Sequence, residues 1–333
     1  MDFYTNVVQW GNFLLVRGVD NNQRVNFRLK YKPTLFVPVM KKTDWKTLDG
    51  KSVTPYQFDC IKDAKDFLLK YESQPHLVHG LNRFAYTYIS DTFPQKVNWN
   101  IDKILIMTID IEVQCENGFP NPESAIEPLL SITVKNQQSK KIIVWGIQPY
   151  KNTREDVTYI RCPNEHDLIM EFMSFWTKNY PDVITGWNTD FFDVPYLANR
   201  IKKVCGEDKM RELSPWKNVS SKQIYSMGRN HLMYDIMGVS QYDYLQLYQK
   251  FTYTRQESYK LDYIASVELG EKKDENPYET FREWYENDFQ SFIDYNIQDV
   301  EIVDKLEDKM GLIDLALTMA YEGKANYFDV FGD

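Results

Sequence analysis

The segment Ile104-Leu105-Ile106-Met107-Thr108-Ile109-Asp110-Ile111-Glu112-Val113 is the part of this 333-residue sequence that decides the fold. Its apolar run is typical of a buried strand, and residues two apart on a strand face the same side of the sheet. Asp110 and Glu112 therefore point into one place. Carboxylates held together repel each other, and the arrangement makes sense chiefly when divalent cations lie between them.

Two later segments add further acids. The segment Asn188-Thr189-Asp190-Phe191-Phe192-Asp193 comes just before a helix expected to begin near Val194-Pro195. Around Tyr295-Asn296-Ile297-Gln298-Asp299 the apolar residues recur at helical spacing, so Tyr295 and Asp299, four residues apart, share a helix face. The predicted site then contains four carboxylates and one tyrosine: Asp110, Glu112, Asp193, Asp299 and Tyr295.

These residue types predict a two-metal nuclease. Two hard cations such as Mg²⁺ or Mn²⁺, about 3.5–4 Å apart, can activate a water and stabilise charge on a phosphodiester, and they prefer carboxylate oxygens as ligands. No histidine lies in the three segments, which argues against a histidine-based zinc or acid–base site. Tyr295 is expected to orient the attacking water, because a phenol with a pKa of about 10 is a poor base at neutral pH.

Each segment also has an ordinary structural interpretation. Asp110 and Glu112 are also compatible with a solvated strand end, and Asp193 with the N-cap of the following helix, where Asn188 would be a turn residue. Tyr295 and Asp299 are also compatible with a surface pair on an amphipathic helix. The occurrence of all three segments together, in this order, favours the metal site.

Composition sets the class of protein. The chain has 43% hydrophobic and 15% aromatic residues and a formal net charge of −9, so nucleic acid must be held by local basic patches and metal ions rather than by a bulk positive field. Its four cysteines are far apart, which excludes a zinc knuckle and a secreted disulfide framework. We find no leader and no membrane-spanning run, and expect a cytoplasmic protein without a membrane partner.

The chain is expected to fold as α/β (α+β) in two parts. Residues 1–103 form a small α+β domain, residues 104–312 a mixed sheet covered by helices, and residues 313–333 a C-terminal segment. In the first part the alternation over 84–89 predicts a strand. In the second part we expect strands over 104–113, 129–134, 141–145 and 183–185, a helix capped by Asn164, a hairpin over 219–236 with its tip at Gly228-Arg229-Asn230, and mostly helix from Tyr242 onward.

The three acidic segments resemble the Exo I, Exo II and Exo III motifs of the tyrosine form of the DEDD exonucleases, as found in family B DNA polymerases. Three further segments, together with Tyr31-Lys32-Pro33-Thr34-Leu35-Phe36, are similar to T-even-type phage polymerases: Thr185-Gly186-Trp187-Asn188, Asp243-Tyr244-Leu245-Gln246-Leu247-Tyr248 and Ser258-Tyr259-Lys260-Leu261-Asp262-Tyr263-Ile264. The resemblance implies a ribonuclease-H-like exonuclease domain and 3′→5′ proofreading on single-stranded or frayed primer DNA. It makes the four carboxylates the ligands of two Mg²⁺ or Mn²⁺ ions and Tyr295 the water-positioning residue.

The sequence departs from that family in one respect, because none of the polymerase motifs of the palm is found. We therefore expect no DNA synthesis by this chain alone, and residues 313–333 to lead towards a palm carried elsewhere, in a truncated or a naturally split enzyme. Expected partners are single-stranded and primer–template DNA. Further expected partners are the polymerase remainder, a sliding clamp and RNA. The expected location is the cytoplasm of a bacterial host. Two alternatives are a non-catalytic nucleic-acid-binding regulatory module and a free-standing DEDD ribonuclease.

Further residues are candidates for contacts with nucleic acid. Phe119 is expected to stack on the terminal base or to anchor its loop. Asn188 and Arg229 are expected to contact DNA. Arg229 lies on a predicted hairpin that resembles the strand-separating element of these polymerases, or that is an ordinary exposed hairpin. One face of the strand around residues 24–32 is basic and is either a phosphate-binding surface for template or RNA or merely solvated. Its basic residues are Arg24, Arg28, Lys30 and Lys32.

Overall fold

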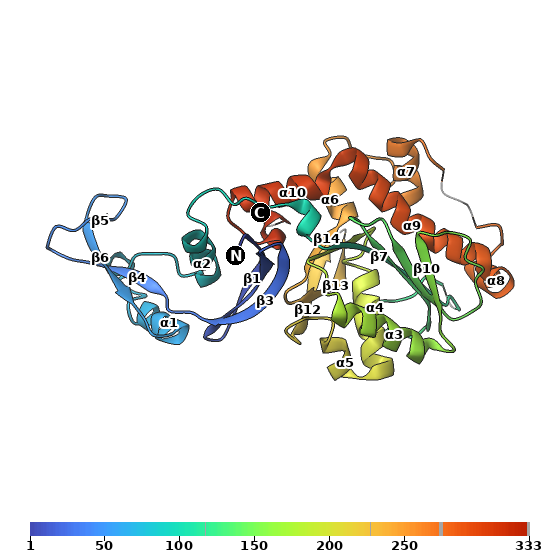
Figure 1. The fold of residues 1–333 in the computed structure, drawn as a ribbon, viewed down its shortest axis with the longest axis horizontal. Coiled ribbons are helices and arrows are strands. Elements are labelled where there is room, and N and C mark those ends of the chain that lie inside the picture. The colour runs from blue at the N-terminus through green and yellow to red at the C-terminus, as the bar shows by residue number, and fades with distance from the viewer. Residues whose placement is uncertain (117, 227, 273–275, 332–333) are drawn as a thin grey trace. The chain divides into compact units, whose positions relative to one another are not determined.

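The computed structural model describes residues 1–116, 118–226, 228–272 and 276–331, in two compact units. One unit comprises Met1–Lys103 and Thr318–Asp333, and the other comprises Ile104–Leu317 (Figure 1). Asn326 shows why the chain returns to the first unit. Its side-chain amide donates to the carbonyl of Val7, and its Oδ1 accepts from the Val7 amide, both at 2.8 Å. The assignment of residues 313–333 to a separate segment stays a prediction.

The first unit contains two small antiparallel sheets and two helices. One sheet has the order β1-β2-β3, formed by Phe3–Trp10, Phe13–Asp20 and Gln23–Lys30. The other has the order β4-β6-β5, formed by Thr34–Pro38, Ser52–Gln57 and Trp45–Lys46. The helices are α1 (Ile61–Lys70) and α2 (Phe84–Thr92), and short 3₁₀ turns cover Pro75–Leu77, Ile101–Lys103 and Tyr327–Phe331.

The strand predicted over 84–89 is wrong, because these residues begin α2. Phe84, Ala85 and Ile89 are the buried residues of this helix. Their spacing of four to five residues places them on one helix face. A short aromatic-rich window fits the strand period and the helix period nearly equally, and packing of that face decides between them.

The second unit is built on a six-stranded mixed sheet of order β10-β9-β8-β7-β11-β14. Its central strands β7, β8 and β9 pair antiparallel, whereas β10, β11 and β14 pair parallel with their neighbours. The strands are β7 (Ile106–Val113), β8 (Leu129–Asn136), β9 (Ile142–Gly146), β10 (Val157–Arg161), β11 (Val183–Gly186) and β14 (Ser240–Asp243). This confirms the mixed sheet, while β10 and β14 were not predicted, the latter overlapping the region from Tyr242 onward that was expected to be mostly helix.

Helices cover both faces of this sheet, as Figure 1 shows. The helices α3 (Glu165–Lys178) and α4 (Asp193–Cys205) pack on one face against Ile109, Ile111 and Ile132, among others. The helices α8 (Phe281–Asn287) and α9 (Phe289–Met310) pack on the other face. The alternation of β7 thus sends Ile109 and Ile111 to one layer and Asp110 and Glu112 to the other. The fold class is α/β, with a mixed sheet covered by helices.

The remaining elements include the predicted helix cap and the predicted hairpin, but Arg229 and Asn230, expected at the hairpin tip, pair with Ser226 and Tyr225 in the strands. The Asn164 side chain caps α3 by accepting from the Asp167 amide at 2.9 Å. A hairpin is formed by β12 (Val219–Ser226) and β13 (Arg229–Ile236), and Met227 in its connection lies outside the described residues. Further helices are α5 (Glu207–Arg211), α6 (Tyr244–Phe251), α7 (Leu261–Leu269) and α10 (Leu312–Glu322). Among the helices described, none combines the length and the apolar character that crossing a bilayer requires.

A buried ion pair fixes α9 to the sheet and gives a first prediction. Lys135 on β8 and Asp304 on α9 are both buried, with 2.9 Å between the ammonium nitrogen and the carboxylate oxygen. Asp304→Ala removes that carboxylate and should lower the free energy of unfolding by about 3–5 kcal/mol, measured by urea titration. Glu286→Ala, which breaks the exposed Arg282–Glu286 pair, is the control and should change it far less. Equal losses in the two variants would contradict this.

Candidate active site

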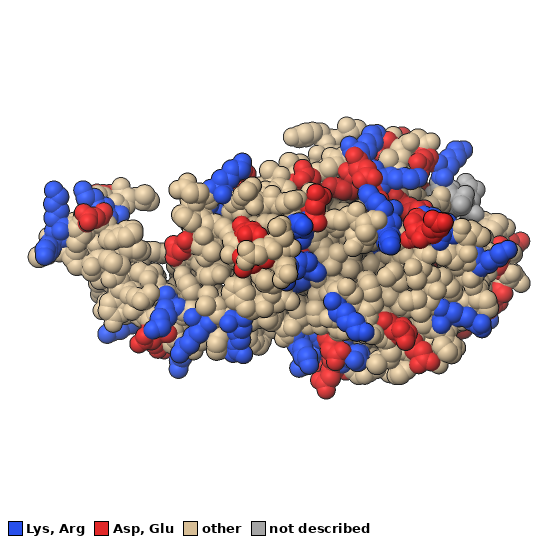
Figure 2. Space-filling view, in the orientation of Figure 1, with Lys and Arg blue, Asp and Glu red and all other residues tan. Residues whose placement is uncertain are grey.

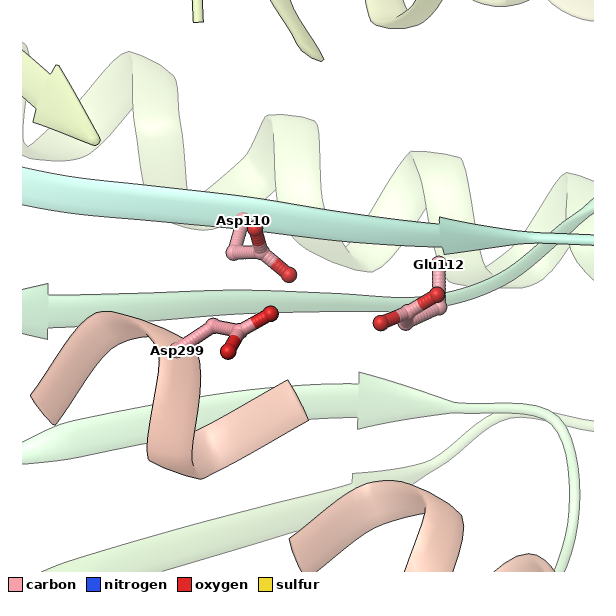
Figure 3. A group of neighbouring side chains, drawn as sticks. All are labelled: Asp110, Glu112 and Asp299. Carbon is pink, nitrogen blue, oxygen red and sulfur yellow. The ribbon is translucent and has the colours of Figure 1, made fainter. Parts of the chain in front are cut away.

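Three carboxylates from two elements converge at the sheet face that α9 covers. Asp110 and Glu112 come from β7, and Asp299 comes from α9. One carboxylate oxygen of each lies within 4.8 Å of the others, and Figure 3 shows the three side chains pointing toward one another. Asp299 is only 9% exposed. The arrangement does not fit the alternatives of a solvated strand end and a surface pair.

Asp193 lies beside this group but is not part of it. It is the first residue of α4, so the cap position belongs to Phe192, and no side chain caps this helix. The Asp193 Oδ1 instead accepts a hydrogen bond from the backbone amide of Ile111 at 3.1 Å. The alternative that Asp193 is an N-cap is therefore wrong. This hydrogen bond holds the Asp193 carboxylate against β7, the strand that carries Asp110 and Glu112.

Burial dominates the electrostatics of Asp193. Loss of solvent raises the pKa of its carboxyl from 3.8 to about 8, helped by the charges of Asp243 and Asp299 and opposed by the hydrogen bond from Ile111. In the metal-free protein this carboxyl is thus a poor anion at neutral pH. A bound cation would reverse that preference, since opposite charge favours the ionised form.

All four carboxylates line one cavity of about 640 Å³. Its acidic floor is bordered by aromatic side chains: Phe119, Trp187, Phe192, Phe281 and Tyr295. The Trp187 ring nitrogen donates to the carbonyl of Tyr259 at 3.0 Å, which holds one wall in place. The cavity combines carboxylates that could hold a cation with aromatic surfaces suited to a nucleobase.

Tyr295 enters the cavity from α9, one helical turn before Asp299. Its ring packs edge-on against Trp284, with 4.9 Å between ring centroids, and lies near Phe281. These aromatic neighbours hold the ring while the residue lines the cavity. Tyr295 therefore lines the same cavity as the four carboxylates, with its ring held by Trp284.

The donor set suits a hard divalent cation. Oxygen atoms of Asp and Glu are the ligands that Mg²⁺ and Mn²⁺ prefer. Cys115 also lines the cavity, but burial and the charges of Glu112 and Glu127 raise the pKa of its thiol to about 11. The thiol is then protonated at neutral pH and is no thiolate ligand. The carboxylates could therefore hold magnesium or manganese.

A second cavity of about 340 Å³ adjoins the first and shares Phe119, Pro120, Asn188 and Phe192 with it. Arg229 of the hairpin lines it, and the Arg229 Nε donates to the His231 ring at 3.2 Å. Phe119 is 83% exposed, so it is not a buried anchor of its loop. The structure thus brings Phe119, Asn188 and Arg229 to one continuous surface beside the acids.

The four basic candidates for phosphate contacts lie on the edge strand β3 or just after it. The apolar side of β3 is only partly covered, since Phe27 is 36% exposed. The side chains of all four basic candidates are exposed to solvent. Arg28 lies over the Phe13 ring, 3.5 Å from its centroid, and Lys32 pairs with Asp59 at 3.1 Å. None of Arg24, Arg28, Lys30 and Lys32 lines either of the two cavities described above.

Three residues near the site were not assigned a role from the sequence. Asp243 at the end of β14 accepts from the backbone amides of Asn188 and Asp190, at 2.9 and 3.2 Å, and so fixes the segment before Asp193. Asp190 is buried, and this burial raises the pKa of its carboxyl. Asn296 contacts Asp110 directly. Asp190 and Asn296 belong to the second and third acidic segments, but the sequence of a segment does not show which of its polar side chains is buried.

Comparison with known proteins identifies what this fold and site are similar to. A family model described as DNA polymerase family B, exonuclease domain, matches residues 81–264, a range that contains Asp110, Glu112 and Asp193 but not Tyr295 or Asp299. The DNA-directed DNA polymerases of Escherichia phage RB69 and Enterobacteria phage T4 are 33% and 32% identical over 99% of this chain. The DNA polymerase delta catalytic subunit of Candida albicans is 28% identical over 55% of it. The chain spans about 40% of the length of the two phage relatives.

The raised pKa of Asp193 gives a prediction for the metal-free protein. The unfolded carboxyl loses its proton near pH 4 and the folded one near pH 8, so the folded state binds more protons between these values and stability falls as pH rises. Asp193→Asn cannot ionise and keeps an oxygen for the Ile111 amide. In EDTA the melting temperature of Asp193→Asn should be higher than that of the parent at pH 8, and the two melting temperatures should be equal at pH 4.

The control is Glu155→Gln, which replaces an exposed carboxyl in the same unit and should leave the melting curve unchanged at both pH values. A lower melting temperature for Asp193→Asn at pH 8 would show that the ionised carboxylate stabilises the metal-free fold, which is the opposite of the expected effect.

Proposed function

Because this chain belongs to the exonuclease domain family of the family B DNA polymerases, we propose that it is a metal-dependent 3′→5′ exodeoxyribonuclease with a proofreading role. The domain is of the ribonuclease-H-like type. The phage relatives are longer proteins named as polymerases, so synthesis is not proposed for this chain alone. The convergence of Asp110, Glu112 and Asp299, with Asp193 in the same cavity, is the observation that supports the proposal most strongly.

The four carboxylates would hold two Mg²⁺ or Mn²⁺ ions. When bound, such ions supply Lewis-acid stabilisation of the charge on the scissile phosphate and make water a better nucleophile. The protein supplies the positions of the ligands: β7 presents two of them, and the helices α4 and α9 bring one each from opposite faces of the sheet. A nuclease accounts for these acids better than a pure binding module, which has no need to bear their repulsion.

Tyr295 is proposed to orient the attacking water through its hydroxyl. Its ring is held by Trp284 and Phe281, so the hydroxyl keeps a defined position without being a ligand. A phenol is a suitable hydrogen-bonding partner for water at neutral pH but a poor base. Its contribution is positioning, which acts on the rate of the chemical step.

The substrate is proposed to be a single-stranded or frayed DNA end. Phe119 is proposed to stack on the terminal base, and the adjoining cavity to take the preceding nucleotide beside Arg229. Acidic and basic side chains are interspersed over the faces that Figure 2 shows, so the grip on DNA would be local. Because the phage relatives are named as DNA polymerases, the role proposed here is in phage replication, in the host cytoplasm. Contacts with a clamp, RNA or a polymerase remainder stay predictions.

Incubation of the purified chain with 5′-labelled single-stranded DNA and Mg²⁺ or Mn²⁺ should give a ladder that shortens from the 3′ end. Duplex DNA should be digested more slowly, because its end must first be unpaired. EDTA should abolish the activity, and Asp110→Ala/Glu112→Ala should lower it by several orders of magnitude. Full activity in EDTA, or preference for RNA over DNA, would refute the proposal.

Tyr295→Phe deletes one hydroxyl and leaves the four carboxylates in place. The single-turnover rate with saturating enzyme should fall by roughly ten- to a thousandfold, with little change in DNA affinity. Tyr150→Phe is the matched control, since its hydroxyl donates to Asp294 on the same helix at 2.6 Å but does not line the cavity. Its rate should stay near the parental one. Equal rates for the two variants would remove Tyr295 from the mechanism.

A further inference from the structure

Asn296 is a fully buried amide, next to Tyr295 in sequence, on the helix that covers the active face of the sheet. A buried amide must find partners for both its oxygen and its nitrogen, because each unpaired polar atom carries a desolvation cost. In this structure those partners are two hydroxyls of β8 and one carboxylate of β7.

The sheet register explains why these groups meet. Asp110 pairs directly with Thr133 across the antiparallel ladder, and Glu112 pairs with Ser131. Directly paired residues project to the same face, so both hydroxyls stand beside the carboxylates and beneath α9. The Ser131 hydroxyl donates to the Asn296 Oδ1 at 2.9 Å, and the Thr133 hydroxyl donates to the same atom at a shorter distance.

The hydrogen bonds also determine which way the amide points. An ionised carboxylate only accepts, so the atom of Asn296 that faces Asp110 must be the donating Nδ2. It lies 2.5 Å from the Asp110 Oδ2. The two hydroxyls occupy the other end of the amide and oppose its rotation. The hydrogen bonds therefore run in one direction. Thr133 and Ser131 donate to Asn296, and Asn296 donates to Asp110.

We propose that Asn296 is a positioning residue that holds the Asp110 carboxylate in its metal-binding orientation, with Ser131 and Thr133 holding Asn296. The proposal rests on the proposed function, because Asp110 is taken as a metal ligand. Hydrogen-bond partners behind a ligand fix its orientation and typically contribute ten- to a hundredfold to metal affinity or activity. Both hydroxyls donate to the Asn296 Oδ1, so their removal should loosen the amide while Asn296 and Asp110 remain.

Two variants test this series of hydrogen bonds at different points. Asn296→Leu keeps the side-chain size and removes the amide. Ser131→Ala/Thr133→Val keeps both Asn296 and Asp110 and removes the hydroxyls that orient the amide. Thr108→Val is the matched control, because this fully buried hydroxyl on β7 accepts from the Gln137 amide at 3.4 Å and is outside the chain of bonds.

Four quantities are measured for each variant: Mn²⁺ affinity by electron paramagnetic resonance, kcat and KM on single-stranded DNA, and the melting temperature in EDTA. Asn296→Leu should weaken Mn²⁺ binding and lower kcat, each by roughly ten- to a hundredfold, with KM for DNA changed less than about twofold. The double hydroxyl variant should show the same pattern with a smaller loss. Thr108→Val should bind Mn²⁺ like the parent.

The results separate positioning from mere stability. Parental Mn²⁺ affinity and kcat in Asn296→Leu, even with a lower melting temperature, would overturn the proposal. If Asn296→Leu does not fold, the double hydroxyl variant decides, and parental Mn²⁺ affinity in it would overturn the proposal. If the unaltered chain binds Mn²⁺ but degrades no DNA, the proposed function fails, whereas the binding measurements still test the role of Asn296.

Discussion

Electrostatic repulsion between carboxylates is the constraint on which the rest of the second unit depends. Asp110, Glu112 and Asp299 have oxygens within 4.8 Å of one another, and Asp193 borders the same cavity. Such a group is unfavourable without cations. The fold therefore supplies donors to these acids, including the Ile111 amide to Asp193 and the Asn296 amide to Asp110. These hydrogen bonds hold the acids in place without a metal, which is the preorganisation that the proposed metal site requires.

The placement of α9 is the second requirement, because this helix carries Tyr295, Asn296 and Asp299 together. Apolar packing against β8 and β9 gives the helix its contact face. Polar contacts fix its register along the sheet: Arg154 with Glu301, and Lys135 with Asp304. Directional contacts of this kind oppose sliding of the helix, which apolar packing alone permits more readily. A small shift would misplace the Tyr295 hydroxyl and the proposed metal ligand Asp299 at once.

The sequence alone determined the features that depend on local periodicity and composition. Alternation in the segment 104–113 places Asp110 and Glu112 on one face, and helical spacing does the same for Tyr295 and Asp299, because backbone geometry fixes these relations within a few residues. The Asn164 cap, the hairpin and the mixed sheet covered by helices follow from similar local signals. The resemblance of the motifs to family B exonucleases also needed only the order and spacing of residues.

Only the tertiary structure decided which side chains meet. Asn296 lies 186 residues from Asp110 and 163 from Thr133 in the sequence, and the contact of Asp193 with Ile111 spans 82. No periodicity reports such contacts, since they arise when a helix packs on a sheet in one register. The same reason explains the error at Phe84, where burial of one face selected a helix over a strand of nearly equal local preference. Packing across long sequence separations thus turned four acids into one site and placed a buried amide behind the first of them.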